Sequence, residues 1–417
     1  MTRSASLRWI AAAILIGIAA AVVPHLVSRA SPRPEPAITM APGVGMPGGP
    51  PTSADGLRQR IAEMEGRLET DPDDLAAAVL LGDALLREAR ATNDGRPASR
   101  ASAVLAAVLK KNPGQYDALR LLGAIHLSQH RFRDALEVGR RARDQRPDDA
   151  WNYGVIGDAL IELGEYDRAF EAFDRMMSLR PSAAAYARVA YARELRGNPD
   201  GALEAMRLAA GSAAPQDPEA QAWYATQLAE LHLKNGRLVE ADREYRRAVF
   251  LYPYYPLAMV GLGRVKVERG DSDTALEIYL DQLKRTPTLD LAARIGDLYA
   301  GRGDAARAEH YFQLAEELAG PGVAQTEAAL ALFLANHDRK LADAVSIAEA
   351  VAARRQDIFT EDALAWSYFK AGRIEEAHSA SQRATRTGSR DPRIVAHAAA
   401  ILEARKSRVA SHKSQVD

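Results

Sequence analysis

Apolar residues recur at helical spacing through most of the chain, with polar residues between them. After Gly164, for example, Tyr166, Ala169, Phe170 and Phe173 fall on one face of a helix. Glycine or proline interrupts the pattern at short intervals, which predicts many short amphipathic helices joined by tight turns. We therefore expect an all-α fold.

The helices are predicted to come in pairs, because three kinds of residue recur together along the chain. A small residue is followed seven residues later by a turn residue, usually glycine, and twelve residues later by alanine. From Gly123 to Gly296, steps between neighbouring small residues are 33 or 34, except for one of 39 that contains the inserted segment AAGSAAPQDP at 209–218. The small residues are Gly123, Gly157, Ala190, Ala229, Gly263, Gly296 and Ala365, and the turn residues are His130, Gly164, Gly197, Gly236, Gly270, Gly303 and Gly372.

Each recurring position has a physical reason. A small residue in the first helix of a unit (helix A) lets the second (helix B) cross it closely. The turn glycine adopts a left-handed backbone conformation at no steric cost. Alanine in helix B packs against the crossing, and proline ends helix B in several units.

This unit resembles the tetratricopeptide repeat (TPR), a helix–turn–helix of 34 residues whose copies stack into an α-solenoid. The resemblance implies a right-handed superhelix. Two further units fit around Gly82 and Ala331, and the first carries about seven extra residues after helix A, in ATNDGRP. We expect about nine units between residues 73 and 387, followed by a closing helix near 391–405.

Several segments, among them QHRFRDALEVGRRA and EDALAWSYFKAGRIEEA, are similar to a family of bacterial secreted or membrane-anchored TPR proteins. That family has no settled biochemical activity. The resemblance therefore implies a fold and a compartment rather than a reaction.

The first thirty residues are predicted to target or anchor the chain. Arg3 and Arg8 precede an apolar run from Trp9 to Val23. Residues 1–30 are interpreted as a single-pass membrane anchor or, alternatively, a cleaved signal peptide, with a buried soluble helix as the least favoured interpretation. Residues 31–55 are rich in proline and glycine and predict a disordered linker.

This organisation predicts an envelope protein. We expect the α-solenoid to occupy residues 56–405 and a polar tail to occupy 406–417. Either interpretation of the N-terminal segment places the solenoid outside the cytoplasm. It would be anchored to the inner membrane if the segment is retained, and secreted or periplasmic if it is cleaved.

Composition narrows the possible chemistry. Lys and Arg (54) balance Asp and Glu (55), which disfavours a dedicated nucleic-acid binder, and the absence of cysteine excludes disulfides and thiolate metal sites. The sequence has no phosphate-binding loop, nucleophile elbow or zinc-protease motif. His126 and His130 have the spacing of two metal ligands but lack a carboxylate or thiol partner. We therefore predict no cofactor, no metal and no enzymatic activity.

A surface remains as the candidate site. In TPR proteins helix A lines the concave wall of the superhelix, and the resemblance assigns to this wall three of the four tryptophans together with charged residues of both signs. A mixed charge suits a protein or peptide segment, and no asparagine stands one residue after any of the small residues, as a chaperone-tail clamp requires. For each ring the alternative is packing between helices A. The predicted partner-binding residues are Trp151, Asp158, Arg188, Tyr191, Trp223, Gln227, Glu230, Arg264, Arg294 and Trp366.

The sequence thus predicts a non-catalytic scaffold in the cell envelope that binds a protein or peptide through its concave helix-A surface. The alternative is an accessory factor in an envelope biogenesis pathway, such as cytochrome c or exopolysaccharide assembly.

Overall fold

The computed structural model of the chain describes residues 54–92, 94–319 and 327–413, and within these ranges it contains helices and no strand. The predicted anchor at 1–30, including Trp9, and the linker up to residue 53 lie outside the described residues. Among the helices that are described, none combines the length and the apolar character needed to span a membrane. The all-α prediction is confirmed for the described part of the chain.

The described helices form one leading helix, nine pairs and one closing helix, which matches the predicted number of units. The leading helix is α2 (Ala54–Thr70) and the closing helix is α21 (Pro392–Lys413). Units 1 to 9 are α3 (Leu75–Thr92) with α4 (Gly95–Lys111), α5 (Tyr116–Ser128) with α6 (Phe132–Gln145), α7 (Ala150–Glu162) with α8 (Tyr166–Leu179), α9 (Ala183–Leu195) with α10 (Pro199–Gly211), α11 (Pro218–Lys234) with α12 (Leu238–Leu251), α13 (Pro256–Glu268) with α14 (Ser272–Arg285), α15 (Leu289–Gly301) with α16 (Ala305–Ala319), α17 (Glu327–Asn336) with α18 (Leu341–Ala352), and α19 (Ile358–Lys370) with α20 (Ile374–Ala384).

The turn between helices A and B has the left-handed backbone that the sequence predicts. Gly164 has φ +77° and Gly197 has φ +68°, and the glycines of the later turns are alike. His130 in unit 2 and Asp338 in unit 8, which stand where most other turns have glycine, also adopt a positive φ, of 58° and 52°. The repeat positions were therefore assigned correctly at this turn.

In several units the small residue of helix A makes room for a ring of helix B. A Cβ atom added at Gly157 would lie 2.3 Å from Cε1 of Phe173, and one added at Gly263 would lie 2.1 Å from Cε1 of Tyr279. We predicted that the small residue serves close approach of the helices, and the structure shows that an aromatic side chain fills the space above it.

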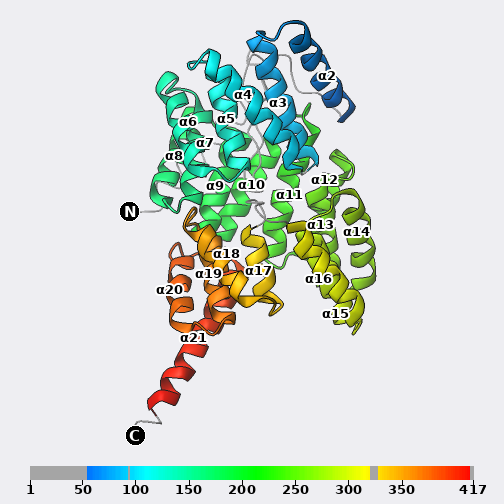
Figure 1. The fold of residues 1–417 in the computed structure, drawn as a ribbon, viewed down its shortest axis with the longest axis vertical. Helices are drawn as coiled ribbons and strands as arrows, with labels where there is room; N and C mark the ends of the chain where they lie inside the picture. Colours follow the sequence, from blue (N-terminus) through cyan, green and yellow to red (C-terminus); the bar gives the residue numbers. More distant parts are fainter. Residues whose placement is uncertain (1–53, 93, 320–326, 414–417) are drawn as a thin grey trace.

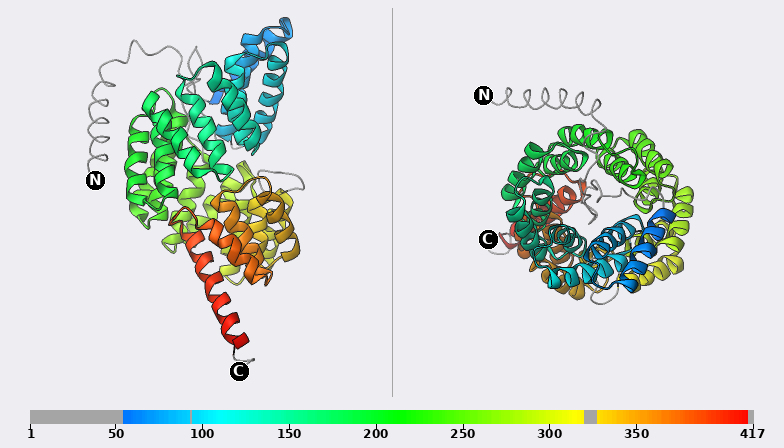
Figure 2. Two further views of the ribbon diagram at one scale, coloured as in Figure 1. Left: turned by 90° about the vertical axis from the view of Figure 1, so that its left-hand side faces the viewer. Right: turned by 90° about the horizontal axis from the view of Figure 1, so that it is seen from above.

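The helices curve into a ring when the molecule is viewed from above (Figure 2). Odd-numbered helices of successive units pack against one another, for example α5 against α7 and α11 against α13. Among the described residues, the even-numbered helices of successive units show no packing of this extent. Helices A therefore form the inner, concave layer and helices B the outer layer.

The chain accommodates the two inserted segments partly by lengthening helices: residues 91–92 lie in α3, whereas residues 212–217 connect α10 to α11. Helix α3 has 18 residues and α11 has 17, whereas α7 and several other helices A have 13. Pro218 occupies the first turn of α11, and the side chain of Asp217 caps it by accepting a hydrogen bond from the backbone of Ala220. The segment 209–218 contains four alanines, which favour helix, whereas ATNDGRP contains one.

The closing helix is longer than predicted. Helix α21 continues past residue 405, where we placed the start of a polar tail, and it projects beyond the body of the molecule (Figure 1). Residues 406–410 are exposed, so this last part of the helix consists of polar and helix-favouring residues on the surface.

The array also contacts itself beyond neighbouring units. Helices α18 and α19 lie directly below α9 (Figure 1), and the backbone N–H of Ile358 donates a 2.8 Å hydrogen bond to the hydroxyl of Tyr166 in unit 3. The backbone N–H of Gln356 likewise donates to the carbonyl of Glu162 over 3.0 Å. We call this contact between the turns of units 2 to 4 and the loops of residues 355–358 and 386–391 the seam.

Candidate functional site

The structure divides the predicted partner-binding residues into a buried group and an accessible group. Trp151, Arg188 and Trp223 are buried, with 6%, 3% and 1% of their surface exposed. The other predicted residues are half-buried on the concave layer: Asp158, Tyr191, Gln227, Glu230, Arg264, Arg294 and Trp366.

The two buried tryptophans pack in the interior. Trp223 meets Tyr224 edge-on with ring centroids 5.1 Å apart, inside an apolar cluster of units 3 to 6. The guanidinium of Arg120 lies 5.1 Å from the ring of Trp151. In this structure both rings follow the packing alternative and offer no surface to a partner.

Arg188 is held by its neighbour on the preceding helix A. Its Nη2 lies 2.5 Å from Oδ2 of Asp158, and its Nε lies 3.0 Å from Oδ1 of the same carboxylate. Burial raises the pKa of Asp158 even though the guanidinium acts against this shift. The pair therefore links α7 to α9 and is a structural contact.

Similar ion pairs cross from one unit to the next along the concave layer, and sequence reasoning did not anticipate them. Oppositely charged residues at related positions of successive units are the signal that could have revealed them. The pairs are Asp158–Arg188, Glu194–Lys234, Glu230–Arg264, Asp297–His337 and Asp338–Lys370. The wall is consequently close to neutral over short distances.

A patch at the middle of the array is partly exposed to solvent. We define the central patch as Gln227, Glu230, Arg264 and Arg294, which come from α11, α13 and α15. Nη1 of Arg264 lies 2.7 Å from Oε2 of Glu230, and these side chains are 29% and 26% exposed. Nε of Arg294 lies 2.7 Å from Oδ2 of Asp290, and the Arg294 side chain is 34% exposed.

Electrostatics keep the arginines of the central patch charged. Burial lowers the pKa of Arg264, but the carboxylate of Glu230 more than offsets this effect, so the pKa is raised. The same balance with Asp290 raises the pKa of Arg294. Both guanidiniums are therefore charged donors that also face solvent.

Trp366 lies apart from the central patch, in unit 9. Its ring stacks on His397 with centroids 3.9 Å apart and an interplanar angle of 5°. Its Nε1 donates a 2.8 Å hydrogen bond to Oδ1 of Asn336, a residue that sequence reasoning missed. The ring is half-buried, so one part of it remains available for contact.

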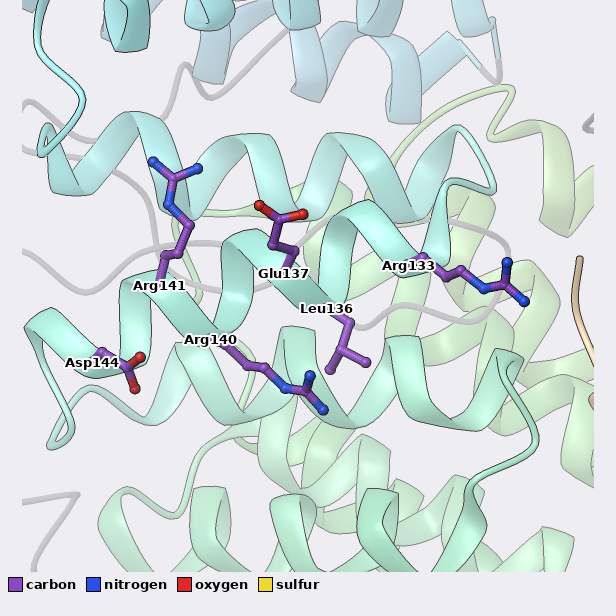
Figure 3. A pocket seen from close by; sticks show the side chains of 6 residues that line it. All are labelled: Arg133, Leu136, Glu137, Arg140, Arg141 and Asp144. Carbon is purple, nitrogen blue, oxygen red and sulfur yellow. The ribbon is translucent and has the colours of Figure 1, made fainter.

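The outer layer carries a surface hollow that was not predicted. It lies on α6, with Arg140 and Leu136 directed to one side and Glu137 and Arg141 to the other (Figure 3). The lining residues are Arg133, Leu136, Glu137, Arg140, Arg141 and Asp144. This hollow belongs to a helix B and is separate from the concave layer.

The two histidines of unit 2 have different surroundings. His126 is buried, and Nδ1 of His130 accepts a 3.3 Å hydrogen bond from Nη1 of Arg355. Burial and nearby arginines lower the pKa of each histidine to about 4. Within the described residues, no three His, Asp or Glu side chains are grouped as metal ligands.

Comparison with protein families agrees with this architecture. A family model of the tetratricopeptide repeat matches residues 93–150 and 226–290, and a second model of the same repeat matches residues 126–193. No protein of curated function matches the sequence.

Solved structures of similar fold are large TPR arrays. The human IFIT1 dimer with m7Gppp-AAAA is 16% identical, with a TM-score of 0.53 over 80% of this chain and 77% of that one. The human IFIT1 dimer with PPP-AAAA is 15% identical, with a TM-score of 0.52 over 80% and 78%. The Cut9–Hcn1 hetero-tetramer of the APC/C is 16% identical, with a TM-score of 0.49, and the match covers 84% of this chain but only 59% of that chain.

At 15–16% identity the similarity to the IFIT1 structures supports the fold alone. The matched repeat models and the helix pairs with left-handed turns agree with it on one architecture. Such repeats indicate a scaffold for protein–protein interaction, and the chain belongs to the tetratricopeptide repeat proteins.

Proposed function

We propose that this chain is a non-catalytic scaffold of the cell envelope that binds a protein or peptide segment at the central patch of its concave layer. The observation that carries the proposal is the placement of Arg264 and Arg294 there. Both are charged and partly exposed, and each already pairs with a carboxylate of the protein itself. A segment with its own acidic and polar groups can bind such donors bidentately.

The mixed charge of the patch supports a peptide or protein partner. Glu230 and Asp290 lie beside the two arginines, so the patch repels a dense polyanion more than it repels a segment of mixed charge. Gln227 adds an uncharged donor and acceptor on the same layer.

The envelope location is supported by the sequence of residues 1–30. Two arginines followed by the apolar run are typical of a segment that leads or anchors a chain at the membrane. In the anchored form, the solenoid lies on the extracytoplasmic side of the inner membrane.

Site-specific crosslinking tests the position of the binding surface. A photoreactive benzoylphenylalanine at Gln227 of the full chain should crosslink a partner in cells. The same group at Gln145, an exposed residue near the end of α6 on the outer layer, should not. Crosslinks from Gln145 alone would place the binding surface on the outer face.

A matched pair of substitutions tests the arginines. Arg294→Ala should reduce the Gln227 crosslink by about tenfold, corresponding to the loss of a charge-assisted hydrogen bond. Arg285→Ala is the control, because Arg285 forms the same i,i+4 pair with Asp281 on an outer helix, at 3.0 Å and with 45% exposure. Equal crosslinking in the two variants would contradict the proposal.

A further inference from the structure

The seam brings the turns of units 2 to 4 against loops that follow much later in the chain. Its centre is Arg355, whose Nη2 lies 2.9 Å from Oε2 of Glu162 and whose Nε lies 2.7 Å from Oδ2 of Asp357. These three side chains are 17%, 10% and 3% exposed. A largely buried cation is thus shared by one carboxylate from each side of the seam.

An apolar contact, an ion pair and a cation–π contact continue the seam around this cluster. Ile358 is fully buried and belongs to the same apolar cluster as Leu195 of unit 4. Nζ of Lys234 in unit 5 lies 3.4 Å from Oδ2 of Asp391. The guanidinium of Arg386 lies 5.0 Å from the ring of Tyr166.

The turn glycines show where the seam leaves no space. A Cβ atom at Gly197 would lie 2.2 Å from the carbonyl oxygen of Gly388, and one at Gly164 would lie 2.6 Å from that of Gln356. At Gly236 and Gly270, which occupy the same turn position in units 5 and 6, a Cβ atom would meet nothing within 4 Å. Two glycines of the repeat are therefore required by the seam as well as by their backbone conformation.

The seam also accounts for the turn residue of unit 2. His130 takes the left-handed conformation that costs a non-glycine residue free energy, and its side chain reaches Arg355 across the seam. Glycine at this position would relieve the strain but would remove the contact.

We propose that units 8 and 9 dock across the seam onto units 2 to 5 and hold the superhelix closed, and that release of this contact exposes the concave layer to the partner. The second part rests on the function proposed above. The seam consists of loops and a buried ion cluster rather than two fully apolar faces. The desolvation of buried charges offsets much of their attraction, so such a contact can separate while the helix pairs stay intact.

Distance measurements on the full chain in detergent test the closure. The natural chain has no cysteine, so spin labels can be attached at introduced cysteines without background. Asp167→Cys and Gln382→Cys place labels at exposed positions on the two sides of the seam. Double electron–electron resonance should give one narrow distance distribution.

Matched glycine substitutions then separate the seam from the backbone. Gly197→Ala and Gly236→Ala impose the same backbone cost, at φ +68° and +69°, but only the first places a methyl group in the seam. The distance across the seam should lengthen and broaden in Gly197→Ala and stay unchanged in Gly236→Ala. His130→Gly adds no clash and should also broaden the distribution. Labels at Asp167→Cys and Gln145→Cys, within units 2 and 3, should keep their distance in every variant.

Chemical accessibility tests the second part of the proposal without a partner. Gln227→Cys should react with a maleimide carried on a bulky polyethylene glycol faster in the Gly197→Ala chain than in the Gly236→Ala chain. The exposed Gln145→Cys should react equally in both.

The two parts of the proposal are contradicted by different results. An unchanged seam distance in both Gly197→Ala and His130→Gly would overturn the closure. A longer distance with an unchanged reaction at Gln227→Cys would overturn control of access. Neither result depends on the crosslinking that tests the proposed function, so the two can fail separately.

Discussion

Arg90 and Glu219 form a buried ion pair that joins the two lengthened helices α3 and α11, although the residues belong to units 1 and 5. Their side chains are 2% and 10% exposed, and the hydroxyl of Tyr255 lies 3.5 Å from Oε1 of Glu219. The extra residues of the two units thus meet in the interior.

Removing one member of this pair should destabilise the protein strongly. Glu219→Ala takes the carboxylate away from the buried guanidinium, which should cost about 3–5 kcal/mol of unfolding free energy in urea titrations. Arg90→Met combined with Glu219→Leu removes both charges and should recover most of this loss. A double variant as unstable as the sum of both single changes would show that the pair is not coupled.

Filling the space above a small residue should also destabilise the repeat. Gly263→Ala places a methyl group against the ring of Tyr279 and should cost about 1–3 kcal/mol, measured as a lower urea midpoint. Gly211 is the control, because a Cβ atom there meets nothing within 4 Å and Gly211→Ala should not lower the midpoint. Equal losses in the two variants would mean that the ring moves freely.

The two tryptophans with contrasting burial should respond differently to truncation. Trp223→Ala should cost about 3–5 kcal/mol because the ring is fully buried. Trp366→Ala should lose roughly 0.5–1.5 kcal/mol from the stacking on His397. Thermal unfolding followed by circular dichroism measures both, and a small loss for Trp223→Ala would contradict its placement in the core.

The stability of the protein should fall as the pH drops from about 6.5 toward 4. Burial lowers the pKa of His126 to about 4, so the folded chain keeps this histidine neutral while the unfolded chain takes up a proton. The stability that comes from keeping His126 neutral is fully present above about pH 6.5, and about 3 kcal/mol of it is lost between about pH 6.5 and pH 4.

A variant without this titration isolates the effect. His126→Gln should lose less stability than the natural chain between pH 7 and about pH 4.5 in urea titrations, because all other groups titrate equally in both. Parallel curves for the two proteins would show that His126 is not buried in its neutral form.

The helix pairs could be predicted from the sequence because they depend on residues that lie close together in the chain. The turn glycines need a positive φ, and in several units a ring sixteen residues further on needs the small residue, so both recur at regular spacing in the sequence. The inserted segment at 209–218 was harder to interpret, since its alanines are compatible with either a loop or a longer helix.

The candidate site could be predicted only as a face of the helices. Periodicity assigned Trp223 and Gln227 to the same side of α11, but it does not predict how far each side chain is buried. The depth depends on neighbours from other units, as for Arg188 and Asp158, and on the seam, which joins residues about 190 positions apart. No local pattern of residues encodes such a contact.

The hydrogen bond between Tyr166 and Ile358 also changes how the array should fold. In an ordinary solenoid each repeat touches only its neighbours, so stability is a sum along a line and ends can fray independently. Here unit 9 contacts unit 3, so forming this contact costs the conformational entropy of closing the chain between them. We therefore expect the repeats between units 3 and 9 to fold first through contacts with their neighbours. They should unfold as one cooperative unit only after unit 9 has docked onto unit 3.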